Sequence, residues 1–340
     1  MIVQQKSYMQ WLSESTRTRW WHDSGDPDEL RFSLEHGATG VTTNPVLINA
    51  ALRARPDFWR ERIASMEPEE CVRAVVTHAA ELFLSAYEDS GRADGFVCAQ
   101  VDPGLVGERE AMLAMARRFH GFAENIAVKL PVTAAGLDIL EECVAEGITI
   151  TGTVSFCVPQ VLAIAERHRR GVERAKANCV EPGKCFAVIM IGRIDDYLRD
   201  VAHDMGAKVS EQDIRSAGIA ATKRANALFR ERDYEAELVI AALRGKHHVV
   251  EVSGADFIMS IHPTYQAMFL EEDMPREERI DAEVPADVVD RLMTIPEFVR
   301  AYEPDGMDVS DFIAYGASQR TLSQFLETGW KGIEKFCASG

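Results

Sequence analysis

One lysine stands inside an apolar run, in the stretch AVKLPV that covers residues 127–132. If this run is a strand, Lys129 shares one face with Ala127 and Pro131, and its side chain points into the protein. Burial disfavours the charged form of an amine, and a neutral amine can attack a carbonyl carbon to form a Schiff base. In the alternative interpretation, the lysine pairs with a carboxylate for stability, because buried charges are generally paired. The run alone does not separate the two, so the other polar residues must decide.

A carboxylate and three neutral polar groups end other apolar runs. Asp23 closes the run RWWHDS, where it could move protons or cap the next helix. Asp26 is the better cap, which favours a catalytic Asp23. Asn44 in TTNP, Gln100 in CAQVDP and Thr153 in TGTVSF could orient a polyhydroxylated substrate and a water. Each of these three could equally bond the backbone of its own turn.

Two arginines follow neighbouring apolar runs, Arg193 in MIGRIDD and Arg244 in AALRGKHH. A guanidinium group fits the oxygens of a phosphate in a bidentate manner, and phosphate sites in α/β barrels are often built around the last strands. In the alternative interpretation, Arg193 pairs with Asp195 or Asp196. The presence of two arginines at neighbouring strand ends favours the phosphate site.

Eight short β-like runs alternate with longer amphipathic segments. This order predicts a parallel sheet of βα units, and eight is the strand number of the (β/α)8 TIM barrel. The runs cover residues 19–24, 39–45, 95–103, 125–132, 147–156, 185–193, 237–243 and 255–263. Barrel enzymes carry their chemistry at the carboxyl ends of the strands, where the polar residues above would meet.

The run GITITGTVSF shows which side chains face the inside of the barrel. Thr149, Thr151, Thr153 and Ser155 alternate with apolar residues and therefore share one face. A hydroxyl stripe inside a barrel indicates a wet, functional interior. The alternative is an antiparallel strand with one solvated face, for which alternation is the usual signature.

The chain of 340 residues and 37.8 kDa is long for one domain, but an α/β barrel reaches ~250 residues before additions. We therefore expect residues 1–340 to form one domain. A helix should precede the first strand, the barrel should cover about residues 19–270, and C-terminal helices at about 284–337 should pack on it. An acidic, proline-containing stretch at 271–287 is expected to be a surface excursion.

Charge and composition exclude several partners. The 54 acidic and 37 basic residues give a net charge of -17, which repels nucleic acid and anionic membranes. Any site for an anionic substrate must therefore be local. The seven cysteines lack CxxC pairs and are expected to be reduced, and the chain has neither a signal peptide nor a run of ~18 apolar residues, so a cytoplasmic location is expected. No motif for a metal or for a nucleotide cofactor is present in the sequence, so we expect neither.

Taken together, the motifs resemble the transaldolase family. HDSGDPDEL, GVTTNPVLI, AVKLPVTAAGLDILEECVAEGI, TGTVSF, IGRIDD and GADFIMSIHP occur in the order of the family across about residues 19–265. The resemblance implies a class I (β/α)8 barrel without metal or organic cofactor, in which Lys129 forms a Schiff base with a ketose. It also implies that Asp23 is the acid/base group, and that Gln100 and Thr153 are catalytic, with Thr153 helping to hold a water. Substrate-binding positions implied in the same way are Thr43, Asn44, Thr151, Arg193 and Arg244.

Four positions bear on which branch of the family the chain resembles. Gln100 stands where transaldolases usually have glutamate, as in the fructose 6-phosphate aldolase branch, and glutamine cannot act as a base. Thr151 and Val188 replace an expected asparagine and serine. Phe156 replaces the tyrosine of the aldolase branch and resembles the transaldolases proper. The expected site is therefore mixed.

The sequence thus predicts an enzyme that transfers a three-carbon dihydroxyacetone unit from a ketose phosphate to an aldehyde, as in the pentose phosphate pathway. The alternatives are a fructose 6-phosphate aldolase-like enzyme, a biosynthetic aldolase with an unusual acceptor, and a barrel that binds sugar phosphates without turnover. A homo-oligomer is compatible with the sequence, which does not specify the oligomeric state.

Overall fold

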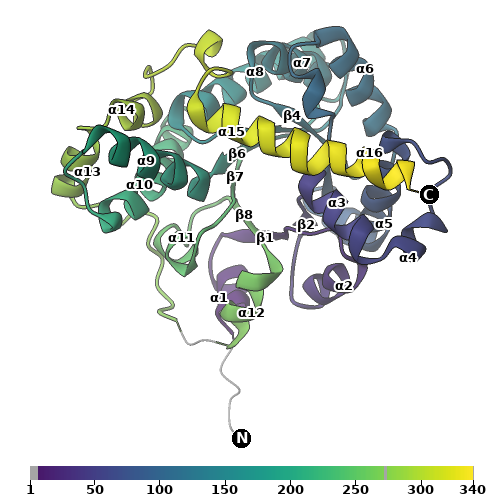
Figure 1. Cartoon of the computed structure of the whole chain (residues 1–340), viewed down its shortest axis with the longest axis horizontal. Helices are drawn as coiled ribbons and strands as arrows, with labels where there is room; N and C mark the ends of the chain where they lie inside the picture. Colours follow the sequence, from purple (N-terminus) through teal and green to yellow (C-terminus); the bar gives the residue numbers. More distant parts are fainter. Residues whose placement is uncertain (1–6, 272–273, 340) are drawn as a thin grey trace, which may run out of the picture.

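The computed structural model describes residues 7–271 and 274–339 (Figure 1). Eight strands form a closed barrel in the order β1 to β8, and every neighbouring pair is parallel. The predicted (β/α)8 TIM barrel is confirmed, and the antiparallel alternative for the fifth strand is wrong. The strands are β1 (Arg19–His22), β2 (Gly40–Val41), β3 (Phe96–Gln100), β4 (Ile126–Pro131), β5 (Ile150–Thr153), β6 (Cys185–Met190), β7 (Glu237–Ala241) and β8 (Ile258–Ile261).

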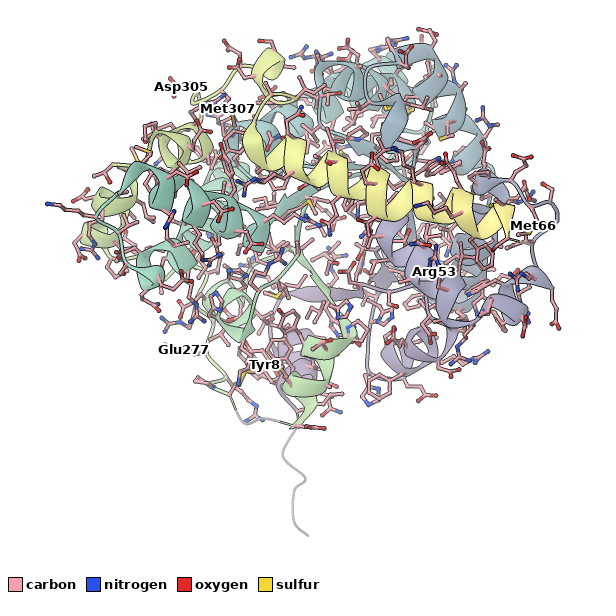
Figure 2. The ribbon with its side chains drawn as sticks, in the orientation of Figure 1. Tyr8, Arg53, Met66, Glu277, Asp305 and Met307 are labelled. Atoms are coloured by element: carbon pink, nitrogen blue, oxygen red, sulfur yellow. The ribbon has the colours of Figure 1, made fainter. Side chains whose placement is uncertain are left out.

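Helices surround the barrel and connect its strands. The chain enters through α1 (Tyr8–Ser15), and Tyr8 lies beside α12 (Pro263–Glu271) (Figure 2). The Tyr8 ring stacks 5.5 Å from the ring of Phe269 on α12. The helices that follow are α2 (Pro27–Glu35), α3 (Pro45–Ala54), α4 (Pro56–Arg60), α5 (Pro68–Asp89), α6 (Arg109–His120), α7 (Ala134–Ala145), α8 (Val158–Ala177), α9 (Ile191–Met205), α10 (Glu211–Glu231), α11 (Lys246–Glu251) and α12 (Pro263–Glu271). A short 3₁₀ turn, η1 (Pro103–Leu105), follows β3. In the part of the chain described, no helix is long and apolar enough to cross a membrane.

The C-terminal segment is helical and crosses one face of the molecule (Figure 1). It comprises α13 (Ala286–Leu292), α14 (Pro296–Tyr302), the 3₁₀ turn η2 (Val309–Asp311), α15 (Gly316–Gln324), the π-helical η3 (Phe325–Trp330) and α16 (Lys331–Ala338). The η3 segment and α16 lie against α3. The approach is close, because a Cβ atom on Gly329 would lie 2.6 Å from Cβ of Pro45. The segment therefore helps to fix α3, which begins beside the mouth of the barrel.

The barrel interior changes in character along its axis. In its lower half, aromatic rings of β1, β3 and β6 fill the space, with the Phe186 ring 4.7 Å from Trp21 and 5.3 Å from Phe96. Four residues after Phe96 on β3, the register places Gln100 beside Lys129, and Lys129 beside Thr151. Since side chains alternate along a strand, this polar layer faces inward above the aromatic one.

At the amino end of the barrel, a cation lies between two carboxylates. Arg19 on β1 donates to Asp94 Oδ1 at 2.9 Å and to Glu237, the first residue of β7. These ion pairs join β1 and β7 to the loop before β3, and they compensate the positive charge of Arg19.

Candidate active site

A cavity of ≈ 340 Å³ opens at the carboxyl end of the barrel. It is lined by residues from several strand ends and from η3, which is the position that catalytic sites occupy in this fold. The sequence-predicted residues that line it are Asp23, Asn44, Lys129, Thr153, Arg193 and Arg244. Three further predicted residues, Thr43, Gln100 and Thr151, do not line the cavity and lie beside Lys129 instead.

Lys129 lies at the inner end of this cavity and is 5% exposed. Its Nζ donates a hydrogen bond to the backbone oxygen of Thr43 at 3.1 Å. Among the described residues, no carboxylate oxygen lies within 4.0 Å of this nitrogen to form an ion pair. The alternative of a stability-related ion pair is therefore wrong for Lys129, and the amine faces space that a ligand can enter.

Two buried polar atoms in the layer around Lys129 have no hydrogen-bond partner in the described chain: Oε1 of Gln100 and Oγ1 of Thr153. Leaving such an atom unsatisfied costs about 1–3 kcal/mol, so a water or a ligand is expected at each. Thr151, which also belongs to this polar layer, does have a hydrogen-bond partner, because its hydroxyl contacts Sγ of Cys98 at 3.4 Å. It therefore shapes the wall below the cavity.

Asp23 projects into the cavity from the end of β1. The helix that follows is capped by Asp26, whose side chain accepts from the N–H groups of Asp28 and Glu29, as the sequence comparison of the two aspartates predicted. Asp23 instead accepts a hydrogen bond from the Thr42 hydroxyl at 2.8 Å.

The Thr42 hydroxyl also contacts a serine, and so it links Asp23 to β8. Its oxygen lies 2.5 Å from Oγ of Ser260, on β8. Because Thr42 gives its single proton to Asp23, Ser260 is the donor in this contact. The sequence analysis did not identify Thr42 and Ser260, although they lie at inward positions of the predicted second and eighth runs, respectively.

Asn44 is the N-cap of α3, so the alternative that it bonds the backbone of its own turn is correct for its side-chain oxygen. Its Oδ1 accepts from the N–H groups of Val46 and Leu47 at 3.0 and 3.2 Å. Since the oxygen is held in this way, the amide NH₂ of Asn44 is the group left to donate to a ligand in the cavity.

Arg193 is half-buried and faces the cavity from the first turn of α9, just beyond the strand end where the sequence placed it. Its guanidinium lies 5.5 Å from the centroid of the Phe325 ring, and its Nε–H has no partner in the described part of the chain. Burial, and then the charge of Arg244, lower the pKa of Arg193 to about 10. A nearby anion would relieve both effects.

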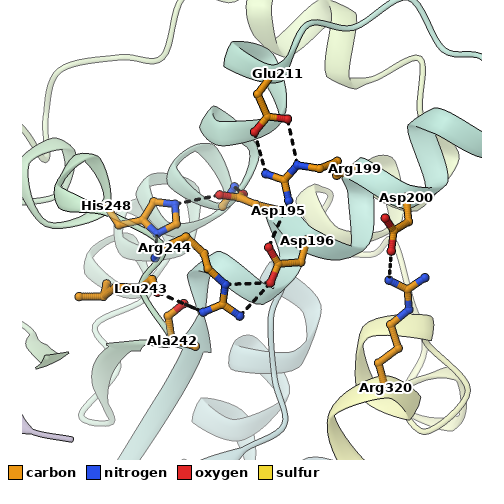
Figure 3. Close-up of polar contacts among 11 residues, drawn as sticks. Asp195, Asp196, Arg199, Asp200, Glu211, Ala242, Leu243, Arg244, His248 and Arg320 are labelled. Carbon is orange, nitrogen blue, oxygen red and sulfur yellow. Dashed lines mark hydrogen bonds and ion pairs between the residues drawn. The ribbon is translucent and has the colours of Figure 1, made fainter. Parts of the chain in front are cut away.

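Arg244 lies in the loop after β7 and is half-exposed. Its guanidinium contacts Oδ2 of Asp196 at 2.8 Å and the backbone oxygen of Ala242 at 3.0 Å. The proposed pairing of Arg193 with Asp195 or Asp196 is therefore wrong, because Asp196 binds Arg244 and Arg199, and Asp195 binds His248 (Figure 3).

Two of the strand ends that form the site have a strained backbone. Val154, directly after β5, and Ala242, directly after β7, both have φ of 57°. This left-handed conformation is unfavourable for residues with a Cβ atom, at about 1–3 kcal/mol each, and it persists only where neighbours hold it in place. At Ala242 the backbone oxygen accepts from the N–H of Gly192 at 3.2 Å. A Cβ on Gly192 would lie 2.4 Å from that oxygen, so only glycine permits this approach.

The remaining wall includes residues that sequence reasoning did not assign to the site. Phe325 is buried and lines the cavity, as do His262, directly before α12, and Tyr265 in its first turn. Val188 lines the cavity as well, whereas Phe156 is fully buried and is not part of the lining. No sequence signal pointed to η3, because its contact with the site depends on the docking of the C-terminal segment.

One side-chain cluster has metal-binding residue types. Asp195, His247 and His248 place one ligand atom each within 4.8 Å of one another. However, Nδ1 of His248 accepts from the backbone N–H of Arg244 at 3.1 Å, so its Nε2 carries the proton and donates it to Asp195 at 2.8 Å. A metal ligand needs a free lone pair, so this hydrogen-bonded arrangement does not fit a metal.

The fold and the site define an eight-stranded α/β barrel with a polar cavity at the carboxyl ends of its strands, as in barrel enzymes. The sequence matches the transaldolase/fructose-6-phosphate aldolase family over residues 20–315, and the chain belongs to this family. The expected membership is thereby confirmed.

Individual relatives are distant. The chain is similar to "Transaldolase 1" of Streptomyces avermitilis, with 29% identity over 201 residues, which covers 55% of this chain and 52% of that protein. It is 30% identical to a transaldolase of Neisseria gonorrhoeae over 183 residues, 50% of this chain and 52% of the relative. These matches span about half the length of the relatives, whereas a transaldolase of Thiobacillus denitrificans is 24% identical over 337 residues, 93% of each chain.

Proposed function

We propose that the chain transfers a three-carbon dihydroxyacetone unit from a ketose phosphate to an aldehyde through a Schiff base on Lys129. One observation carries the proposal: a buried lysine that has no carboxylate partner among residues 7–271 and 274–339 lines the same cavity as Asp23. A cytoplasmic role in carbohydrate metabolism, such as the pentose phosphate pathway, is part of this proposal.

The reaction begins with attack of the Lys129 amine on the ketone carbon of the sugar. Loss of water gives a cationic iminium, which withdraws electrons from the neighbouring carbon-carbon bond. Asp23 removes the proton from the C4 hydroxyl, the C3–C4 bond breaks, and its electron pair forms an enamine on Lys129. The first aldehyde leaves, a second aldehyde is attacked by the enamine, and Asp23 returns its proton to the new hydroxyl group.

Water enters this cycle when the Schiff base forms and when it is hydrolysed. The unsatisfied Gln100 Oε1 and Thr153 Oγ1 support a water site beside Lys129. Glutamine can hold a water but cannot take its proton, so another group must act as the base when the Schiff base is hydrolysed. Because Gln100 stands at this position as in the fructose 6-phosphate aldolase branch, it also supports the second candidate, a fructose 6-phosphate aldolase-like enzyme that releases dihydroxyacetone rather than transferring it.

Arg193 and Arg244 supply the charge that a phosphorylated substrate requires. Both line the cavity, and their mutual repulsion is relieved when a phosphate dianion binds between them. Thr43 and Thr151 contribute indirectly in this scheme, since Thr43 holds Lys129 and Thr151 lies next to it in the register. The NH₂ group of Asn44 is placed to donate to a sugar hydroxyl.

Borohydride trapping tests the proposal. The enzyme is incubated with fructose 6-phosphate and borohydride and then weighed by mass spectrometry. We expect a covalent adduct on the wild type that maps to Lys129 and is absent from Lys129→Met. Unmodified wild-type enzyme under these conditions would refute the Schiff base, whereas an adduct with free dihydroxyacetone as the product would favour the aldolase-like candidate.

A further inference from the structure

A buried aspartate-histidine pair lies directly behind the loop that carries Arg244 (Figure 3). Asp195 is 1% exposed and His248 is 0% exposed, and their Oδ2 and Nε2 atoms are 2.8 Å apart. Neither residue lines the cavity. The chemistry proposed above leaves this pair without a role.

The direction of the hydrogen bonds in this pair is fixed by the backbone at both ends. The N–H of Arg244 donates to Nδ1 of His248 at 3.1 Å, so the imidazole proton is on Nε2 and points at Asp195. At the other end, Oδ1 of Asp195 accepts from the N–H of Gly218 on α10 at 2.8 Å. With its proton on Nδ1 instead, the imidazole would present a donor to the N–H of Arg244, and two donors would face each other.

The pair joins the two segments that carry the arginines. Asp195 lies two residues after Arg193 on α9, and His248 holds the backbone of Arg244 itself. The neighbouring Asp196, also on α9, binds the Arg244 side chain. Two consecutive aspartates of one helix therefore hold the backbone and the guanidinium of the same arginine.

This connection opposes two forces that would move Arg244 away from Arg193. The two guanidinium groups repel each other, and the Arg244 loop contains the strained Ala242. Without a restraint, the loop would relax and the two guanidinium groups would separate before an anion arrives. Preorganised donors bind an anion more tightly than donors that must first be ordered.

We propose that Asp195 and His248 are positioning residues that hold Arg244 next to Arg193 and so set the affinity of this subsite for phosphorylated substrates. This inference rests on the proposed function only in taking the anion to be the phosphate of the substrate. Neither residue is expected to contact the substrate or the reacting atoms.

Matched variants separate positioning from general stability. His248→Leu removes both hydrogen bonds, whereas His248→Gln keeps an acceptor for Arg244 and a donor for Asp195. Asp195→Asn is isosteric but places an NH₂ group against either the imidazole N–H or the N–H of Gly218. Asp200→Asn is the control, since Asp200 lies on the same helix and pairs with Arg320 at 2.6 Å, outside the pair (Figure 3).

Two readouts are measured on folded variants with comparable melting temperatures: KM and kcat for fructose 6-phosphate and for unphosphorylated fructose, and the Kd of inorganic phosphate by calorimetry. For His248→Leu and Asp195→Asn, we expect KM for the phosphorylated ketose and the Kd of phosphate to rise about tenfold. The KM for fructose should stay within about twofold of that of the wild type, because a sugar without phosphate does not use the subsite. His248→Gln and Asp200→Asn should resemble the wild type in both measurements.

The inference is overturned if the variants raise KM for both ketoses equally or if they change only the melting temperature. It is also overturned if His248→Gln raises the Kd of phosphate as much as His248→Leu does. Calorimetry tests the inference separately from the proposed function, because it measures phosphate binding without turnover. A wild type that binds phosphate without turnover contradicts the proposed reaction but still allows the test of positioning. A wild type that binds no phosphate contradicts the positioning itself.

Discussion

Two basic residues of the same barrel have different surroundings. At the amino end, Arg19 lies between the carboxylates of Asp94 and Glu237, which more than balance its positive charge. At the carboxyl end, Lys129 is more deeply buried and bonds only a backbone oxygen among the described residues. We therefore expect Arg19 to stabilise the fold and Lys129 to be available for reaction.

Replacing Lys129 should give the largest effect. Lys129→Met removes the proposed nucleophile, so we expect activity to fall by at least about 10³-fold. The melting temperature should stay the same or rise, because methionine fills a similar volume without a desolvated charge. Activity assays and calorimetry on the same preparation check both parts. A variant that unfolds would instead place Lys129 among the structural cations, with Arg19.

Asp23→Asn tests whether the carboxylate next to the unpaired lysine acts as the acid/base group. The amide keeps the shape and can still accept from Thr42, but it cannot take a proton. We expect kcat to fall about 10²–10⁴-fold, while Schiff-base trapping by borohydride persists because the amine is intact. Ser260→Ala is the comparison, since it removes a hydroxyl from the same chain of hydrogen bonds without removing the base. An Asp23→Asn variant with normal kcat would contradict the assignment.

The contrast also shows what the sequence could and could not predict. Period-2 alternation placed Lys129 inside the barrel, and the order of eight runs predicted the barrel itself, because both depend on local pattern and strand number. The ion pair of Arg19 joins residues 75 and 218 positions away, so no local signal reveals it. The same is true of Phe325, which reaches the cavity only because η3 docks on α3. The roles of the site residues remain predictions until variants are assayed.

His22, next to Asp23, shows a third way to bury a basic group, which is to keep it neutral. Burial lowers the pKa of His22 from 6.5 to about 4, and its Nδ1 lies 2.9 Å from Nε2 of Gln266. Between these two pH values the unfolded chain binds a proton that the folded chain does not, so stability falls as the pH falls. At pH 5 this loss is about 2 kcal/mol relative to pH 7.

The measurement is urea unfolding at pH 7 and pH 5. His22→Asn keeps an acceptor for Gln266 but does not titrate, so its free energy of unfolding should decline less between the two pH values than that of the wild type, by about the same 2 kcal/mol. Equal declines in the two proteins would show that His22 is not the group responsible.

Replacing Arg19 should reverse the pattern expected for Lys129. Arg19→Met leaves Asp94 and Glu237 without their partner, and we expect a loss of about 1–2 kcal/mol because all three side chains are partly exposed. Activity per folded molecule should match the wild type, since the ion pairs lie at the opposite end of the barrel. Arg73→Met, which removes an exposed pair with Glu70, is the control for a surface ion pair. A loss of kcat without a loss of stability in Arg19→Met would remove the distinction between the two ends.

The smallest effect is expected from giving Lys129 a partner. Gln100 is its register neighbour on β3, so Gln100→Glu places a carboxylate beside the amine, as Arg19 has beside its guanidinium. That charge would stabilise the cationic covalent intermediate and lengthen its life for an acceptor aldehyde, which should shift the ratio of transfer to hydrolysis a few-fold toward transfer. Gln100→Leu, which removes the polar group without adding charge, separates the effect of charge from that of the water site. If the ratio is the same in Gln100→Glu and in the wild type, the glutamine at this position does not set the balance between the two reactions.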